Sequence, residues 1–328
     1  MGDFALTLLE WFRENGRALP WRQTQDPYAI WLSEVILQQT QVKQGMNYWL
    51  RFMSHWPTVE LLAAATEDEV LREWQGLGYY SRARNLHFAA RQIVEMGGFP
   101  QTLEGIKSLK GVGDYTAAAI GSIAFGLPAA VVDGNVYRVL SRHFGISTPI
   151  NITEGKKEFS LLANHLLPKK NASAYNQAIM DFGAIQCTPQ SPRCLICPLQ
   201  ESCMALREGR VGELPVKMKT LKVKERHLVY IYVRCQGQIA IHRRGKGDIW
   251  QGLYEPLLTE TVPTDAVMLR EKVRHVLTHR ILLADFYLWE LVERPQLPPD
   301  YFWIEEGELD RYAKPRLIEV LLDAVIRY

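Results

Sequence analysis

The sequence of 328 residues has no long hydrophobic run, no strong charge of one sign and no low-complexity tract. A membrane-spanning helix needs roughly 18 or more consecutive apolar residues, and because no such run occurs we expect no membrane partner. The first sixteen residues, MGDFALTLLEWFRENG, lack the basic start and the apolar core of a signal peptide, which makes the cytoplasm the expected location. The net charge of +2 excludes a globally basic surface, so any nucleic-acid contact must come from a local patch.

Cysteine is scarce outside one short segment. Four of the five cysteines lie within seventeen residues, as Cys187, Cys194, Cys197 and Cys203, with the spacing C-x6-C-x2-C-x5-C. In a cytoplasmic protein such crowding indicates metal binding rather than disulfides. Four thiolates in one loop suit a zinc ion or a 4Fe–4S cluster, and the spacing alone does not choose between them. Cys235 stands apart and is interpreted as a small residue on a strand.

The length predicts about two domains. Up to residue 218 the apolar residues recur at helical spacing, and we find no convincing strand before residue 226. Residues 205–227 carry seven Lys or Arg against three Glu without periodicity, which predicts a linker that either contacts phosphate or is merely solvated. We therefore predict a helical domain over residues 1–218, a linker over 219–225 and an α+β domain over 226–328.

The predicted second domain mixes strand and helix patterns. Leu228–Val233 and Gln238–His242 are strand-like and are separated by a turn, and Ile281–Glu290 also has the pattern of a strand. We predict one helix over Thr264–Glu271 and a last helix with an apolar face that includes Leu317 and Leu321.

A tight turn dominates the stretch from Leu109 to Asn135. Gly111-Val112-Gly113 follows Lys110 and leads into a helix rich in small residues. The glycines allow positive φ and close backbone approach, and Val112 can point inward. Exposed N–H groups at such a helix start favour an anion, so these four residues are candidates for contact with a DNA phosphate. Taken alone, such a turn is more often a structural helix–helix connection.

Two carboxylates are candidates for chemistry. Asp133 follows Tyr115 by 18 residues, and taken alone it is most simply the N-cap of a helix that begins at Val136. Glu34 lies in the apolar half of a helix predicted over residues 29–42, so it should be buried and needs a partner or a proton. Burial raises the pKa of a carboxyl, and a protonated acid can give its proton to a leaving group. An isolated helical glutamate would more often lie on the surface.

Taken together, these motifs resemble the MutY-type adenine DNA glycosylases of the helix-hairpin-helix, or endonuclease III, superfamily. The Gly-Val-Gly turn resembles the superfamily's hairpin, VVDGNVYR the segment with its aspartate, and WLSEVILQQTQV the MutY signature with its glutamate. The cysteine spacing matches the iron–sulfur loop of these enzymes. The resemblance implies an all-α glycosylase domain with a 4Fe–4S cluster in the loop 187–203, in place of zinc.

The resemblance also assigns the chemistry of base excision. Glu34 would protonate adenine at N7, and Asp133 would act beneath the deoxyribose cation, either as an electrostatic stabiliser or as a transient nucleophile. Asn135 would help to orient water or backbone. Tyr115 stands where endonuclease III has an attacking lysine, and a phenol with a pKa of about 10 cannot form a Schiff base. The resemblance therefore implies a monofunctional glycosylase that leaves an abasic site.

Further residues match family positions that contact DNA or the extruded base. Gln39 and Tyr79 match residues that wedge into the duplex, because a base must leave the stack before a buried acid can reach it. Arg17, Trp21 and Gln177 match positions around the adenine pocket. Ordinary packing is the alternative explanation for Tyr79 and for Trp21.

The C-terminal part resembles the Nudix-like domain attached to MutY proteins, through the run RRGKGDIWQGLYE at 243–255. The metal-binding run R-E-x-x-E-E of Nudix hydrolases is absent, so we expect a recognition module without pyrophosphatase activity. Leu277-Thr278-His279 resembles the family's Phe-Ser-His loop, which recognises 8-oxoguanine opposite adenine. The substitutions keep a wedge and a hydroxyl, although a single His279 at a strand edge would ordinarily be structural.

We therefore expect a base-excision-repair enzyme that removes adenine mispaired with 8-oxoguanine or guanine in double-stranded DNA. It would act as a monomer in the bacterial cytoplasm, at the nucleoid. Three alternatives stay open at this point: an endonuclease III-like bifunctional lyase acting on oxidised pyrimidines, a non-catalytic lesion-binding or charge-sensing iron–sulfur protein, and a zinc-stabilised DNA-binding module.

Overall fold

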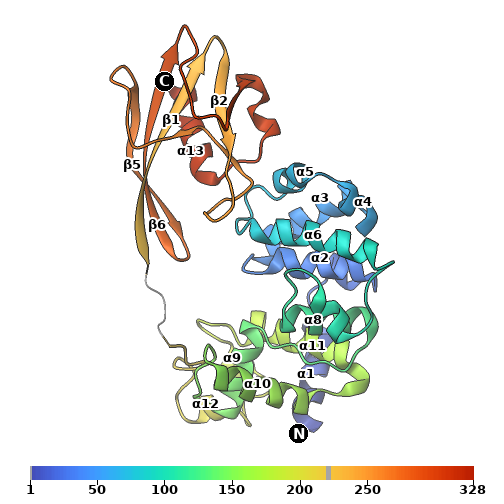
Figure 1. Ribbon diagram of the computed structural model, residues 1–328. Helices are drawn as coiled ribbons and strands as arrows, with labels where there is room; N and C mark the ends of the chain where they lie inside the picture. Colours follow the sequence, from blue (N-terminus) through green and yellow to red (C-terminus); the bar gives the residue numbers. More distant parts are fainter. Residues whose placement is uncertain (1, 219–222) are drawn as a thin grey trace. The chain divides into compact units, whose positions relative to one another are not determined.

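The computed structural model describes residues 2–218 and 223–328, which form two compact units (Figure 1). The described part of the first unit comprises residues 2–49, 56–63 and 88–218, and that of the second comprises 50–55, 64–87 and 223–328. The domain boundaries drawn from the sequence stay a prediction, and residues 219–222 of the predicted linker lie outside the described residues.

Helices make up the regular structure of the described chain before residue 224, in agreement with the predicted helical domain. In chain order they are α1 (Gly2–Asn15), α2 (Pro27–Leu37), α3 (Val42–His55), α4 (Val59–Ala64), α5 (Glu67–Glu73), α6 (Ser81–Glu95), α7 (Leu103–Ser108), α8 (Asp114–Phe125), α9 (Gly134–Phe144), α10 (Thr153–Leu166), α11 (Ala172–Asp181) and α12 (Met204–Arg207). Two short helical turns also matter for the site, namely η1 (Pro20–Arg22) and the π-helical η3 (Phe182–Gln186).

The core of the first unit lies among α1, α8, α9, α10 and α11. Small residues of α8, such as Ala118 and Ala119, are buried there, and α8 packs against both α2 and α11. Small side chains on the packing face of a helix let its neighbours approach closely. This packing brings the start of α8, the start of α9 and the end of α2 together around one space.

The turn between α7 and α8 has the predicted form in part. Gly111 has a φ of +81°, in the left-handed region that favours glycine, and Val112 is buried. Gly113 is extended, with a φ of −96° and a ψ of −178°, so only the first glycine of the pair uses its conformational freedom. Lys110 lies on the exposed side of this turn.

Helix α2 is shorter than the sequence predicts. It begins after Asp26, whose side chain accepts a hydrogen bond from the backbone of Tyr28. It ends at Leu37, because the backbone then turns and Gln39 takes a φ of +56°. The prediction of a helix as far as Val42 is therefore wrong. The residues from 38 to 41 have good helix propensity, but their place at the mouth of a cleft overrides it.

The second unit contains a seven-stranded sheet with the order β3-β2-β1-β6-β5, in which β4 also pairs with β1 and β7 with β2. The strands are β1 (Lys224–Cys235), β2 (Gln238–Arg243), β3 (Tyr254–Glu255), β4 (Leu257–Leu258), β5 (Val267–Leu277), β6 (Arg280–Leu291) and β7 (Tyr301–Glu305). The long strands β1 and β6 run parallel along their whole length. Alternate residues of β1 and β6 pack with α13 (Arg316–Arg327) in one core, which confirms the predicted α+β fold and the last helix.

Two sequence predictions fail around this sheet. The segment Thr264–Glu271 is not a helix, because its residues from Val267 on belong to β5, an outer strand that pairs with β6 alone among the described strands. Register shifts between Met268 and Val273 and a run of charged residues, both typical of edge strands, hide its alternation. The basic segment 205–227 is not a plain linker either, since α12 ends at Arg207 and β1 begins at Lys224.

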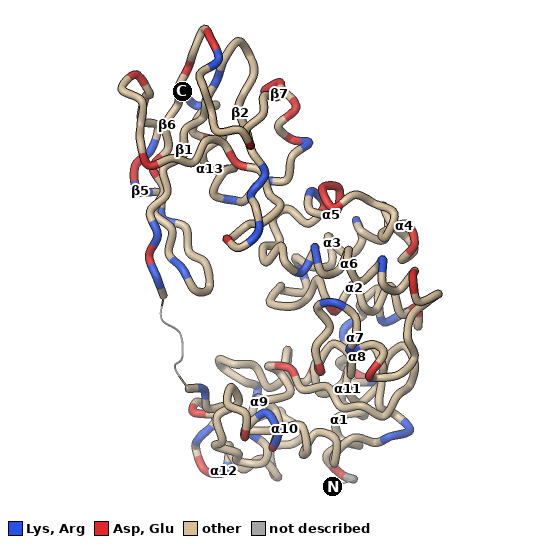
Figure 2. The backbone as a smooth tube through the Cα atoms, viewed as in Figure 1, with Lys and Arg blue, Asp and Glu red and all other residues tan. Residues whose placement is uncertain are grey.

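Basic and acidic residues are interspersed along the whole described chain (Figure 2). This agrees with the small net charge and with the expectation that nucleic-acid contacts are local. Among residues 2–218 and 223–328, no helix combines the length and the hydropathy that a membrane span requires.

Candidate active site

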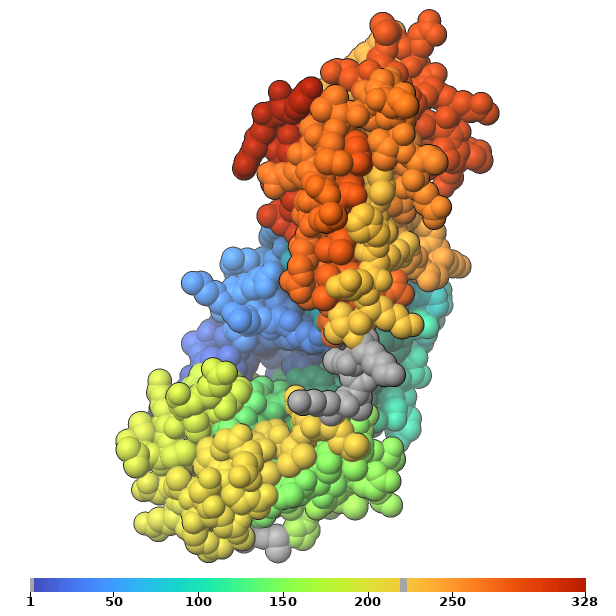
Figure 3. Space-filling model, turned by 90° about the vertical axis from the view of Figure 1, so that its left-hand side faces the viewer, coloured from blue at the N-terminus to red at the C-terminus, as the bar shows by residue number. Residues whose placement is uncertain are grey.

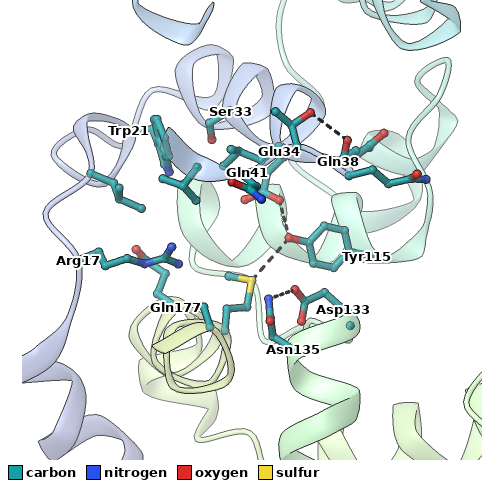
Figure 4. A pocket seen from close by; sticks show the side chains of 18 of the residues that line it. Arg17, Trp21, Ser33, Glu34, Gln38, Gln41, Tyr115, Asp133, Asn135 and Gln177 are labelled. Atoms are coloured by element: carbon teal, nitrogen blue, oxygen red, sulfur yellow. Dashed lines mark hydrogen bonds between the residues drawn. The ribbon is translucent and has the colours of Figure 1, made fainter. Parts of the chain in front are cut away.

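A cleft of about 970 Å³ opens in the first unit between α2, α8, α9 and α11. Eight of the predicted site residues line it, and these are Arg17, Trp21, Glu34, Gln39, Tyr115, Asp133, Asn135 and Gln177. Arg17 and Trp21 lie on one side of the cleft, with Tyr115 and Asp133 across from them (Figure 4). Sequence positions from 17 to 177 thus meet in one space large enough for a nucleoside.

Glu34 is a buried acid whose carboxyl faces the cleft. Its residue is 9% exposed, and the Tyr115 hydroxyl donates a 2.7 Å hydrogen bond to its Oε2 atom. Burial is the main cause that raises the pKa of Glu34 to about 7. The hydrogen bond from Tyr115 and the charge of Arg22 lower this pKa, whereas the negative charge of Asp133 raises it. The side chain therefore holds a proton for a large part of the time at neutral pH, which a general acid requires.

Asp133 is the helix cap that the sequence suggested, and it also lines the cleft. It is the N-cap of α9, with its Oδ1 accepting the Val136 N–H at 2.8 Å. Its Oδ2 accepts a hydrogen bond of 2.8 Å from the Asn135 amide, and the carboxyl lines the cleft. Burial raises the pKa of Asp133, and the donors from Val136 and Asn135 oppose that rise. Donors around a carboxylate favour its anion, whereas Glu34 receives only one.

Arg138 ties the Asp133 loop to the cysteine segment, and sequence analysis missed it. Its Nη2 donates to the Asn135 side-chain oxygen at 2.9 Å and to the Gly183 carbonyl at 2.6 Å. Its Nε donates to the Cys187 carbonyl at 2.7 Å. The guanidinium fork fixes three groups from separate segments, and it also lines the cleft. The run VVDGNVYR contains Arg138, but only the fold shows what it binds.

The other wall of the cleft is made of arginine, tryptophan and amide side chains. Trp21, 6% exposed, packs edge-on against Trp49 with ring centroids 5.6 Å apart, so it is both a core residue and a lining residue. Gln177 on α11 donates to Ser173 at 3.2 Å. Arg22 joins Arg17 in this wall, and sequence analysis did not single it out.

Gln39 and Tyr79, the predicted wedge residues, share an unusual backbone conformation. Their φ angles are +56° and +46°, and both side chains are exposed. A non-glycine residue in the left-handed region costs of the order of 1–2 kcal/mol, so the fold must hold both in place. Gln39 belongs to the cleft of the first unit, whereas Tyr79 lies in the second unit.

Tyr79 borders a second cavity, of about 600 Å³, which lies within the second unit. Leu277, Thr278 and His279 also line it, at the two-residue hairpin that joins β5 to β6. The Tyr79 hydroxyl and the Thr278 hydroxyl form a hydrogen bond. The sequence-predicted wedge and the sequence-predicted recognition loop therefore contact each other, with Trp250 as a further aromatic lining residue.

The four clustered cysteines surround a small cavity of about 30 Å³ in the first unit. None forms a disulfide, and the segment that holds them lies at the surface, coloured yellow in Figure 3. Arg142 donates to the Cys187 sulfur at 3.5 Å, a favourable partner for a thiolate. Within the described part of the chain, no three His, Cys, Asp or Glu side chains converge as they would around one metal ion. Four thiols around one cavity have the donor chemistry of either a 4Fe–4S cluster or a zinc ion.

Comparisons with known proteins identify the same segments. The profile of HhH-GPD superfamily base excision DNA repair proteins matches residues 32–165, that of the iron–sulfur binding domain of endonuclease III matches 187–203, and that of the NUDIX domain matches 229–324. The second match confirms the prediction of an iron–sulfur cluster over zinc. All three agree with the predicted fold class.

Individual relatives extend these matches. An adenine DNA glycosylase of Buchnera aphidicola subsp. Schizaphis graminum is 34% identical over 254 residues, which cover 76% of this chain and 73% of that protein. The human adenine DNA glycosylase is 45% identical over 213 residues, which cover 62% of this chain but 39% of the human protein. The solved structure of a thermostable thymine-DNA glycosylase superposes with a TM-score of 0.59 at 32% identity, covering 63% of this chain and 96% of that one.

Proposed function

The chain belongs to the adenine DNA glycosylases, and from this membership we propose that its cleft hydrolyses the N-glycosidic bond of adenine mispaired with 8-oxoguanine or guanine. The protein is a DNA glycosylase of base excision repair with an iron–sulfur cluster. Its proposed substrate is a mispair in double-stranded DNA, on which it acts as a monomer at the bacterial nucleoid.

The observation that carries the proposal is Glu34, a buried acid with a pKa near 7 in a cleft that also contains Asp133. Adenine leaves poorly as an anion, so cleavage needs a proton on the base. Glu34 supplies that proton at N7. Proton transfer from a positioned acid contributes typically 10²–10⁴-fold to a rate.

Asp133 acts on the deoxyribose side of the N-glycosidic bond. As the base leaves, positive charge builds up on the deoxyribose, and a fixed anion near C1′ stabilises it. Asn135 holds the Asp133 carboxylate through its amide, and both are anchored by the start of α9. Tyr115 orients the Glu34 carboxyl and has no amine, so it forms no Schiff base and the protein leaves an abasic site.

Recognition of the mispair is divided between the two cavities. Extruding adenine costs the duplex a few kcal/mol in lost stacking and pairing. Gln39 fills the space that the adenine leaves in the base stack. Tyr79 wedges into the duplex, and Leu277, Thr278 and His279 beside it read the partner base. The cavity of about 600 Å³ that these residues border is of a size to admit that base. The Thr278 hydroxyl and the His279 ring are the polar groups of this loop that would give a preference for 8-oxoguanine over guanine.

A glycosylase assay tests the proposal on four duplexes, containing A·8-oxoguanine, A·G, T·G and an oxidised pyrimidine. We expect adenine release from the first two. Glu34→Gln should abolish release while duplex binding is kept, and the exposed Glu158→Gln on α10 serves as the matched control. Base release unaffected by Glu34→Gln, or tight binding with no release by the wild type, would contradict the proposal.

The same assay separates the alternatives. Efficient trapping of a covalent adduct by borohydride would indicate an attacking amine, and hence an endonuclease III-like lyase. His279→Ala should reduce the ratio of A·8-oxoguanine to A·G excision while leaving A·G excision within about threefold. An equal loss on both duplexes would show that the loop supports binding in general and does not read the lesion.

A further inference from the structure

The second unit joins two parts of the sequence that lie far apart. Besides residues 50–55, it combines residues 64–87, here called the α5 segment, with residues 223–328, here called the sheet domain. The sequence assigns the α5 segment to the helical domain that it predicts over residues 1–218. In the structure this segment forms one compact unit with the sheet domain, so the two parts share a surface of contact.

Arg243, the last residue of β2, makes the charged part of this contact. Its Nη2 atom lies 2.8 Å from Glu67 Oε1 and 2.9 Å from Asp68 Oδ1, at the start of α5. The Tyr254 hydroxyl donates to the other Asp68 oxygen at 2.9 Å. Carboxylates are favourable at a helix N-terminus without any further partner. The ion pair with Arg243 therefore serves the contact between the two parts and is not required by the helix.

Hydrogen bonds on either side of the ion pair widen the contact. Gln75, just after α5, donates to the Glu319 carboxylate on α13 at 2.5 Å and accepts the backbone N–H of Lys314 at 3.2 Å. Arg84 on α6 donates to the Gln251 carbonyl at 2.5 Å. The α5 segment is thus held by two separate stretches of the sheet domain, one around residue 250 and one at the start of the last helix.

The middle of the contact is closely packed. Gly252 has a φ of +83°, in the left-handed region, and a Cβ added to it would lie 3.1 Å from the Leu71 Cδ1 atom. Leu71 and Leu253 are completely buried. A glycine lets the loop backbone approach the leucine side chain at this point. A packed apolar centre with a polar rim is the usual anatomy of a specific protein interface.

The predicted recognition loop lies at one end of this contact. Tyr79 belongs to the α5 segment, and its hydroxyl forms a hydrogen bond with that of Thr278. Arg280, directly after the hairpin turn, pairs with Asp248 at 3.5 Å, and Arg244 pairs with the same carboxylate at 2.6 Å. The residue next to Arg243 is therefore connected through Asp248 to the hairpin that carries the loop.

We propose that Arg243 is a positioning residue for discrimination between mispairs: by pairing with Glu67 and Asp68 it docks the sheet domain on the α5 segment and so holds residues 277–279 beside Tyr79. The inference rests on the proposed function, because it names the contact that places the recognition loop of that function. An exposed ion pair by itself adds little stability, so its effect here is on position. Elements that are already in place need no ordering when the duplex binds.

The test compares single-turnover adenine release from A·8-oxoguanine and A·G duplexes at saturating enzyme. Arg243→Glu places like charges opposite Glu67 and Asp68, so the ratio of the two rates should fall by about tenfold, with the A·G rate within about threefold of wild type. Adding Glu67→Arg to this variant restores a pair of opposite charge and should recover most of the ratio. Arg311→Glu makes the same change of charge at an exposed site of the sheet domain and should leave the ratio unchanged.

Hydrogen exchange of the DNA-free protein measures the docking without any activity. Arg243→Glu should speed exchange in residues 67–75 and 276–281, whereas a general loss of folding would also speed it along β1. The added Glu67→Arg should slow it again.

An unchanged rate ratio in Arg243→Glu would overturn the inference, and so would unchanged exchange in these two stretches. Failure of Glu67→Arg to recover either quantity would show that the ion pair is not the cause. A wild type that releases no adenine would instead refute the proposed function, and the exchange measurement would still decide whether Arg243 docks the sheet domain.

Discussion

Glu34 and Asp133 have the same functional group, and burial raises the pKa of both, but their hydrogen-bond partners differ. Glu34 sits among apolar residues of α2 and receives one hydrogen bond, from a phenol. Asp133 receives a backbone N–H and a side-chain amide. The two donors to Asp133 favour its anion more than the single donor to Glu34 does, and a site that supplies both an acid and an anion needs such a difference between its carboxyls.

Tyr115→Phe should shift the pH profile of excision in the alkaline direction. The Tyr115 hydrogen bond lowers the pKa of Glu34, so its loss raises that pKa above about 7 and the acid form persists to higher pH. We expect the alkaline limb to move up by about one unit, while the maximal rate falls by up to about tenfold because the carboxyl is less well oriented. Single-turnover rates measured against pH check both. A limb that moves down would contradict the assigned hydrogen bond.

Glu34→Gln should stabilise the protein at alkaline pH although it abolishes catalysis. Because the pKa of Glu34 in the folded protein is raised from 4.5 to about 7, its favourable contribution is present at low pH and is lost as the pH rises through 7. The variant does not titrate there. Its free energy of unfolding relative to wild type should therefore increase by roughly 2–3 kcal/mol between pH 5 and pH 8. Urea unfolding at both pH values measures this, and Glu158→Gln should show no such trend.

For individual residues, the sequence identifies those that belong to a known motif and misses those whose role depends on a partner far away in the sequence. Glu34, Tyr115 and Asp133 could be named because motifs carry them, and the cleft brings them together. The pairing of Arg243 with Glu67 could not be named, because it joins positions 176 residues apart. The role of this pair, like those of the motif residues, stays a prediction until the variants are measured.

Among the elements, the π-helical turn η3 places the end of α11 against the Asp133 loop. Gly183 in this turn has no room for a side chain, since an added Cβ would lie 2.6 Å from the Asn135 Cβ and 2.9 Å from the Asn135 carbonyl oxygen. The carbonyl of Gly183 also accepts a hydrogen bond from Arg138. Insertions into a helical ladder of this kind occur often at functional sites.

Gly183→Ala should therefore reduce both stability and excision. Overpacking of this kind typically costs about 1–3 kcal/mol, and the displaced Asn135 would no longer hold Asp133 in place. We expect a lower melting temperature together with a reduced single-turnover rate at saturating enzyme. Gly212→Ala, where an added Cβ meets nothing within 4 Å, is the control. An unchanged rate in Gly183→Ala would show that the Asn135 position is not critical.

The element boundaries that sequence analysis missed have physical reasons in common. Helix α2 stops at Leu37 because the chain turns into the cleft, and strand β5 was mistaken for a helix because bulges interrupt its alternation. Periodicity reports the face that an element buries, so it predicted the helices of the first unit and the strands β1, β2 and β6 well. Periodicity does not predict the structure of a segment whose conformation is set by the functional site or by its place at a sheet edge.

For the whole molecule, the net charge of +2 requires that affinity for DNA come from a few local contacts. Lys110 at the exposed turn before α8 is one proposed contact. Lys110→Ala should weaken duplex binding and reduce the slope of log affinity against log salt by about 1, since one phosphate contact is lost. Titrations between 50 and 200 mM salt measure the slope. Lys156→Ala on the exposed side of α10 should leave it unchanged, and equal slopes for both variants would exclude Lys110 as a phosphate contact.

Tyr115 has a phenol and no amine, so in the proposed reaction it forms no Schiff base and the sugar–phosphate backbone stays uncut. In that reaction the strand that lost its adenine stays continuous, while the opposite strand still carries its guanine or 8-oxoguanine. Incision must then come from a separate nuclease that acts at the baseless sugar, and a polymerase must refill the gap. Under this proposal the phenol keeps removal of the base apart from cleavage of the strand, so that both strands are not broken at the same place.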